Sequence, residues 1–155
     1  MRAQKWQRGV SVVEVVVLIA ILLVVAAIAI PNLLHSNLSE DESSTVASLR
    51  ALNAACANYS MLYGGYPGSL SNLGPGDAAN STSAALIDAA LASGTKSGYV
   101  FTYTAGAIGI GGNVLSYSIT ANPGAPGRRR FFTDQSGVIR ARTSGAADAN
   151  SAPVG

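Results

Sequence analysis

The sequence predicts an α+β fold in which a long N-terminal helix is followed by a small antiparallel β-sheet. Three observations support this prediction. Sixteen consecutive apolar residues, Val15 to Ile30, form a run longer than a β-strand. Apolar side chains then recur at helical spacing as far as Gly64-Gly65. From Tyr99 onward the pattern alternates with a period of two and is rich in aromatic and β-branched residues.

The apolar half of the long helix, residues 10–37, is predicted to cross a membrane. From Val10 to Leu34 a helix is about 37 Å long, which is enough for a hydrocarbon core of roughly 30 Å. Basic residues precede the apolar run, and this asymmetry places the N-terminus in the cytoplasm. The basic residues in this half of the chain are Arg2, Lys5, Arg8 and, far downstream, Arg50.

Glu14 interrupts the apolar surface one helical turn after Val10. An ionised carboxylate in lipid costs several kcal/mol unless it is paired, so such a residue is a functional candidate. The alternative is that Glu14 lies at the membrane interface, with its carboxylate among the headgroups. The residues before Glu14 favour the functional interpretation.

The order Arg8-Gly9, four further residues, Glu14 and an apolar helix with Pro31 at its far end resembles the N-terminus of type IV pilins and pseudopilins. The resemblance implies that prepilin peptidase removes residues 1–9 after Gly9 and leaves Val10 as a new, methylatable N-terminus. It also implies that Glu14 pairs with the terminal amine of a neighbouring subunit. Val10 and Ser11 stand where phenylalanine and threonine are usual in the family.

This resemblance implies a type IV pilin-like subunit whose partners are prepilin peptidase, an inner-membrane assembly platform, membrane lipid before assembly and further copies of the chain in a helical filament. Its expected location is the inner membrane as a prepilin with a cytoplasmic N-terminus, and an extracellular filament after assembly. Val10, Glu14 and Pro31 are the expected assembly residues. Pro31 is expected to kink or locally unwind the helix.

Residues 38–63 are predicted to form the amphipathic half of the helix, which packs on the sheet. Its apolar positions project onto one arc, and Gly64-Gly65 ends the helix. Cys56, the only cysteine, is interpreted as a small core residue on this arc. The positions on the arc are Val46, Leu49, Leu52, Cys56, Tyr59 and Tyr63.

Residues 64–142 are predicted to form a head of loop, short helix and sheet. The Ser81-Thr82-Ser83 sequence is expected to cap a helix that runs to Leu91 or Ala92. Residues 143–155 are Ala-, Ser- and Gly-rich without periodicity and are expected to be a flexible tail. The three or four expected strands cover residues 99–104, 114–120, 129–133 and 138–142.

Composition argues against a generally basic, nucleic-acid-binding protein. Three of the ten basic residues lie in the first eight positions, so removal of residues 1–9 leaves seven Lys and Arg against eight Asp and Glu. Arg128, Arg129 and Arg130, followed by two phenylalanines, are the one basic-aromatic cluster and provide the weaker alternative of a nucleic-acid contact. The acidic run of residues 40–42 is either a solvated helix face or a contact between subunits.

The sequence contains no catalytic, nucleotide-binding or zinc motif, so we expect neither an enzyme, nor a cofactor, nor a metal site. Three Asn-x-Ser/Thr sequences, at residues 37–39, 58–60 and 80–82, match the glycosylation acceptor pattern, which often occurs by chance. Three functions remain open: a pilin in a fibre for adhesion, motility or surface contact, a pseudopilin of a type II secretion system, and a membrane-anchored binding domain that does not polymerise. Gly9 and Glu14 favour the first two, because a simple anchor needs neither.

Overall fold

The computed structural model describes residues 11–154, with the side chains of residues 28–37 left out of the description. The chain divides into an N-terminal unit, Met1–Leu38, and a C-terminal unit, Ser39–Gly155. Helix α1 (Val12–Tyr63) contributes residues to both units. The remaining elements all belong to the C-terminal unit, and the two units are described separately below.

The end of α1 lies where the sequence predicts it. The backbone N–H of Gly64 donates to the carbonyl of Ser60 at 2.9 Å, and Gly64 has a φ of 77°. This left-handed conformation is readily adopted by glycine and is the usual way to end a helix. The glycine stop therefore follows from the local chemistry of the chain.

The predicted membrane-spanning segment is not supported. Over the described residues, no helix combines the length and apolar character that crossing a membrane requires. This finding overturns the predicted span over residues 10–37 and the inner-membrane location that depended on it.

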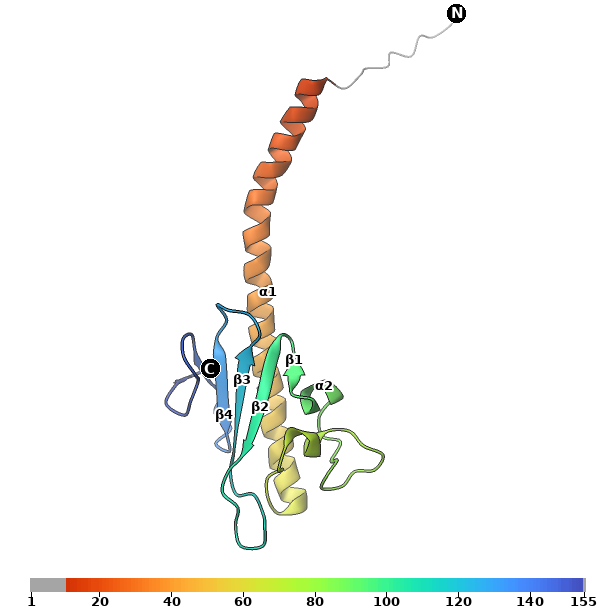
Figure 1. The fold of residues 1–155 in the computed structure, drawn as a ribbon, viewed down its shortest axis with the longest axis vertical. Helices are drawn as coiled ribbons and strands as arrows, with labels where there is room; N and C mark the ends of the chain where they lie inside the picture. The colour runs from red at the N-terminus through yellow and green to blue at the C-terminus, as the bar shows by residue number, and fades with distance from the viewer. Residues whose placement is uncertain (1–10, 155) are drawn as a thin grey trace, which may run out of the picture. The chain divides into compact units, whose positions relative to one another are not determined.

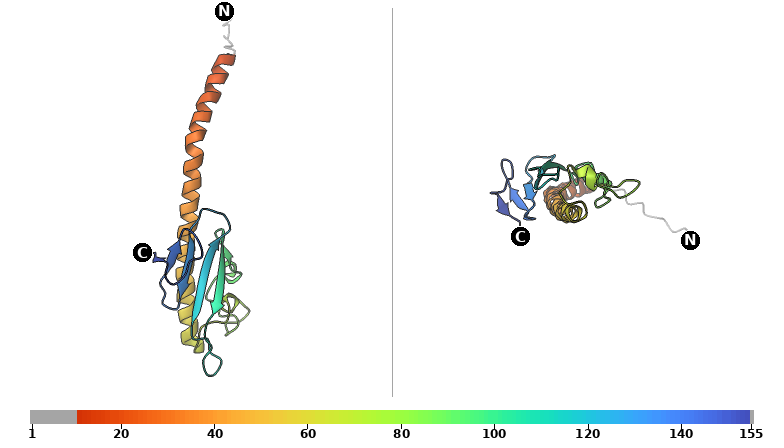
Figure 2. Two further views of the ribbon diagram at one scale, coloured as in Figure 1. Left: turned by 60° about the vertical axis from the view of Figure 1, so that its left-hand side comes forward. Right: turned by 90° about the horizontal axis from the view of Figure 1, so that it is seen from below.

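The C-terminal unit contains a six-stranded antiparallel sheet in which each strand pairs with the next one along the chain. Figure 1 shows its long central strands, and Figure 2 shows the same sheet from two other sides. The sheet is larger than the expected three or four strands. Its strands are β1 (Thr95–Lys96), β2 (Tyr99–Ala105), β3 (Tyr117–Pro123), β4 (Arg130–Asp134), β5 (Arg140–Arg142) and β6 (Ala152–Pro153).

Strand β2 matches its prediction, whereas β3 begins three residues later than expected. Val114 instead forms isolated bridges with Tyr66 and Ile108, which hold the connection after β2 against the end of the helix. Residues 143–155, expected as a flexible tail, also differ from the prediction. They contain β6, whose residue Ala152 pairs with Ala141, and they bury Ser151.

The second predicted helix is much shorter than expected. Helix α2 covers only Ala89–Ala92 and is capped by Asp88, whose carboxylate accepts from the backbone N–H of Leu91 at 2.7 Å. The residues before it bond elsewhere, because the backbone N–H groups of residues 84–87 donate to carbonyls of residues 72–74. The carbonyls at the end of the short 3-10 helix η1 (Leu70–Leu73) and just after it therefore accept the N–H groups of this segment. A helix from Ser81 does not form, because these N–H groups already have partners.

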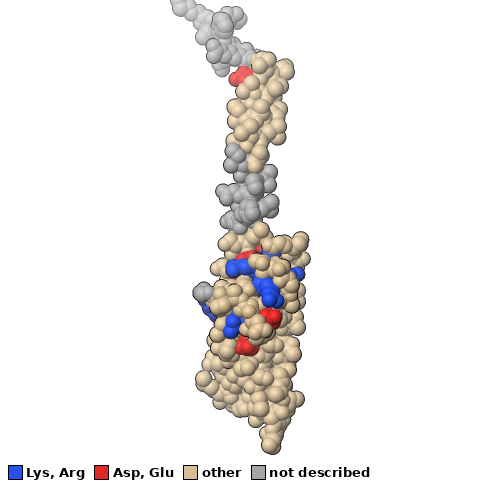
Figure 3. Space-filling view, turned by 90° about the vertical axis from the view of Figure 1, so that its left-hand side faces the viewer, with Lys and Arg blue, Asp and Glu red and all other residues tan. Residues whose placement is uncertain are grey.

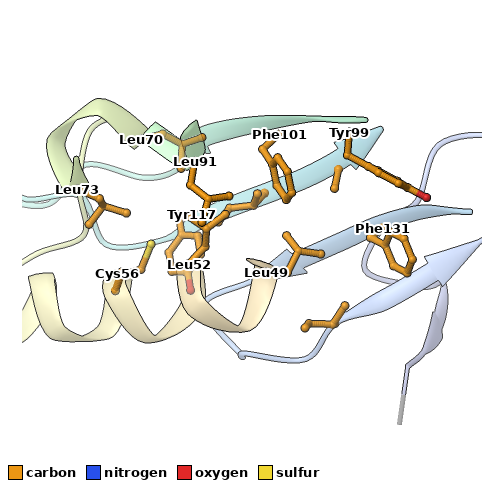
Figure 4. Close-up of a cluster of buried hydrophobic side chains, with 14 of the residues drawn as sticks. Leu49, Leu52, Cys56, Leu70, Leu73, Leu91, Tyr99, Phe101, Tyr117 and Phe131 are labelled. Carbon is orange, nitrogen blue, oxygen red and sulfur yellow. The ribbon is translucent and has the colours of Figure 1, made fainter. Parts of the chain in front are cut away.

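One face of α1 in the C-terminal unit forms the core with the sheet (Figure 4). The predicted arc is confirmed: Val46, Leu49, Leu52, Cys56 and Tyr59 are buried, and Tyr63 is partly buried against the same cluster. From the sheet the cluster takes Tyr99, Phe101, Tyr117, Ile119, Ala121 and Phe131. The loop and α2 add Leu70, Leu73 and Leu91.

Asn53 links the helix to two strands within this core. Its Nδ2 donates to Thr133 Oγ1 at 2.8 Å, and its Oδ1 accepts from the hydroxyl of Tyr117 at 3.1 Å. Thr133 is fully buried, so its hydroxyl depends on a protein partner. The apolar arc identifies the buried face of α1, and Asn53 helps to determine how the strands lie on it.

Leu52→Ala should lower the free energy of unfolding by about 2–5 kcal/mol, because it leaves a cavity in a packed core. Leu62→Ala is the matched control on the same helix. Leu52 is 0% exposed and Leu62 is 66% exposed, so the control should change stability by less than about 0.5 kcal/mol. Urea unfolding followed by circular dichroism measures both. Equal losses would contradict this packing.

Candidate assembly interface

The described part of the N-terminal unit exposes a continuous apolar surface. Twelve large apolar side chains between Val12 and Val25 are 43–78% exposed. Glu14 is the only charged residue among residues 11–27, and Figure 3 shows how little charge this surface carries. A helix that is apolar on every side is normally covered by other structure, and so large an exposed patch marks an interaction surface.

The start of α1 explains how Glu14 is placed. The carbonyl of Ser11 accepts from the backbone N–H of Val15 at 3.1 Å, so Ser11 occupies the position that caps the helix. Ser11 and Glu14 have the spacing of a capping box, and Glu14 lies in the first turn, where a negative charge complements the helix dipole. Glu14 therefore has a local structural role available as well as the pairing role that the family resemblance implies.

The structure places only one of the four predicted site residues fully. Glu14 is exposed within the apolar surface. Gly9 and Val10 lie outside the described residues, and so the predicted processing site stays a prediction. Pro31 lies within the bounds of α1, but its side chain belongs to the stretch left out of the description, so its assembly role and the kink expected there also stay predictions.

The arginine cluster and the acidic run meet inside the C-terminal unit. Arg128 Nη2 lies 2.7 Å from Asp41 Oδ2, and Arg129 Nε lies 2.7 Å from Glu42 Oε2. The backbone N–H of Arg129 also donates to Glu42 Oε1 at 3.0 Å. Basic and acidic side chains accordingly gather together on the face seen in Figure 3. These pairs fasten the segment before β4 to α1.

These contacts account for part of the acidic run. Asp41 and Glu42 form ion pairs within the subunit, whereas Glu40 is exposed, and a contact of the run with another subunit stays a prediction. Arg128 and Arg129 have carboxylate partners, and Arg130 donates to the carbonyl of Gly145 at 3.3 Å. The nucleic-acid contact through these arginines stays a prediction.

Cys56 is a core residue. It is fully buried as a free thiol. Burial raises the pKa of its thiol to about 12, and a hydrogen bond with Tyr117 opposes that rise only in part. A thiol that stays protonated at neutral pH is a poor nucleophile, which agrees with the structural interpretation. Among the described residues, no group of three or more His, Cys, Asp or Glu side chains is arranged to hold a metal ion.

Glu42→Gln tests the ion pairs through their pH dependence. Partial burial would raise the pKa of Glu42, but hydrogen bonds from Arg129 and the charges of Arg129 and Arg128 outweigh it and lower that pKa. The stabilisation is therefore complete above the ordinary pKa of a glutamate and is lost as the pH falls through the lower folded value. At neutral pH the variant should be about 1 kcal/mol less stable, because solvent screens the partly exposed Arg129.

This difference should shrink as the solution is acidified below about pH 4.5, the ordinary pKa of a glutamate side chain. Urea unfolding of both proteins at several pH values measures it. Glu40→Gln is the matched control, since Glu40 is an exposed neighbour without an ion pair among the described residues. A difference that does not depend on pH would contradict this account.

Comparisons of the chain with protein-family models, with curated proteins and with solved structures return no match.

Proposed function

We propose that this protein is a structural subunit of a type IV pilin-like filament, assembled through the first part of α1. The observation that carries the proposal is the apolar surface between Val12 and Val25, which nothing in the described part of the chain covers. Further copies of the same segment would supply the cover that this surface needs. The Arg8-Gly9 and Glu14 pattern supports this choice of partner through the resemblance to type IV pilins.

The energetics of such an assembly are favourable. Burying a large aliphatic side chain contributes about 1.5–3 kcal/mol. If association covers about half of the exposed surface of twelve such side chains, the gain is on the order of 10 kcal/mol per subunit. That is comparable with the roughly 4–15 kcal/mol that association costs in lost freedom, and each subunit in a helical polymer contacts several others.

Glu14 would supply the specificity of this assembly. A carboxylate enclosed by apolar helices is strongly unfavourable unless a cation pairs with it. In the proposed filament that cation is the N-terminal amine of a neighbouring subunit, which becomes available when prepilin peptidase removes residues 1–9. The pair would set the axial position of one helix relative to the next, since any other register leaves the charge unpaired.

Electron microscopy of the purified assembly tests the proposal most directly. A filament subunit should give long helical fibres and a pseudopilin short ones, whereas an isolated binding domain should give none. Monomeric protein after native processing would contradict the proposal.

Glu14→Ala and Glu14→Leu should strongly reduce the yield of filaments, because both remove the carboxylate that pairs with the amine. Glu14→Gln adds a sharper comparison, since glutamine preserves the capping-box pattern but removes the charge. It should also reduce the yield if pairing, and not helix capping, is what matters. Glu40→Ala is the control on the same helix. Quantitative electron microscopy measures all four, and normal filaments from Glu14→Leu would refute the pairing role.

Ala27→Arg should abolish filaments, because it places a charge among apolar side chains that become buried on assembly. The matched control is Ala90→Arg, since Ala90 is an exposed alanine in α2 of the C-terminal unit. This control should fold and assemble normally. Sedimentation measures the filament yield of both variants, and circular dichroism verifies that each one folds. Filaments from Ala27→Arg at normal yield would contradict the proposed interface.

A further inference from the structure

The three Asn-x-Ser/Thr sequences are not equivalent in the structure. Asn58 lies inside α1, where the hydroxyl of Ser60 donates to the carbonyl of Ala57 at 2.8 Å. In a helix, residues two apart do not face each other, so the Ser60 hydroxyl cannot reach the Asn58 side chain. Asn37 also lies within the bounds of α1. Asn80 alone lies in a loop.

The loop around Asn80 is the kind of surface segment that a modifying enzyme can reach. Residues 75–82 are all exposed. Asn80 and Ser83 close a turn, since each backbone N–H donates to the carbonyl of the other, at 3.0 and 3.1 Å. The acceptor pattern therefore sits at the accessible tip of a defined turn.

The side chains of Asn80 and Thr82 are already in contact. Asn80 Oδ1 accepts from the backbone N–H of Thr82 at 2.8 Å and from its hydroxyl at 2.7 Å. Two donors on the carbonyl oxygen draw electron density from the amide and make its N–H easier to deprotonate. The hydroxyl that the acceptor pattern requires is thus bonded to the group that would react.

The turn is also anchored to the core. The carbonyl of Ser81, the middle residue of the pattern, accepts from the hydroxyl of the buried Tyr59 at 2.6 Å and from Asn72 Nδ2 at 3.3 Å. Asn80 Nδ2 donates to the carbonyl of Ala78 at 3.1 Å, a contact that must open for the nitrogen to react. A turn held in this way presents its side chain without a large ordering cost.

We propose that Asn80 is the acceptor of an N-linked glycan, with a lipid-linked diphosphate sugar as the donor. A bond forms between Asn80 Nδ2 and C1 of the first sugar, and the bond between C1 and the diphosphate oxygen breaks. The diphosphate leaves with the electron pair, and the amide proton passes to a base of the transferring enzyme. The transfer is a substitution at C1 of the sugar, so no atom is oxidised or reduced. The proposal does not depend on filament assembly.

Peptide mass spectrometry of the protein purified from its native cells tests this proposal. Trypsin leaves Asn58 and Asn80 on one peptide, because no Lys or Arg lies between Arg50 and Lys96, and chymotryptic cleavage after Tyr63 separates them. The peptide with Asn80 should carry a sugar mass. Release by peptide N-glycosidase in heavy-oxygen water should leave a labelled aspartate at position 80. An unmodified Asn80 peptide overturns the proposal.

Variants expressed in the same cells show whether transfer of the sugar depends on the acceptor pattern at residues 80–82. Asn80→Gln and Thr82→Ala should lose the sugar completely, whereas Thr82→Ser should keep it, since serine retains the hydroxyl. Asn58→Gln is the matched control and should keep the full mass. A sugar that persists in Asn80→Gln would be linked to a hydroxyl of this loop and would overturn the proposal. Asn80 and Thr82 are exposed, so each variant should fold normally.

Discussion

The packing of one face of α1 on the antiparallel sheet is the interaction on which the C-terminal unit depends. Leu49 and Leu52 are fully buried with Ile119 of β3 and Phe131 of β4 in one apolar cluster. A sheet of this size needs a covering element, because its apolar face would otherwise meet water. The helix supplies that cover, and the loop and α2 close the edge of the cluster with further leucines.

Polar contacts determine how the strands lie on this helix. Burial of apolar area has no preferred direction, whereas hydrogen bonds and ion pairs hold only at particular positions. Asn53 connects α1 to β3 and β4, and Glu42 binds both the backbone and the side chain of Arg129 just before β4. Two residues of the arginine cluster, Arg128 and Arg129, thereby hold the segment before β4 on α1.

The same helix has a different relation to solvent in its first part. In the N-terminal unit, residues 12–25 have no packed face among the described residues and expose apolar side chains on every side. An exposed apolar surface of this size is a candidate interaction surface. That contrast, together with the isolated carboxylate of Glu14, is the physical basis of the proposed filament subunit.

The sequence alone determined the features that depend on near neighbours: the end of α1 at Gly64, its buried arc and the strand that begins at Tyr99. Contacts between distant residues decided the rest. Residues 143–155 have no periodicity, yet β6 forms because β5 offers a free edge to Ala152. Residues 84–87 do not continue a helix because carbonyls near Leu73 accept their N–H groups. Local pattern cannot predict these outcomes, since each hydrogen-bond partner lies elsewhere in the chain and only the folded backbone brings it within reach.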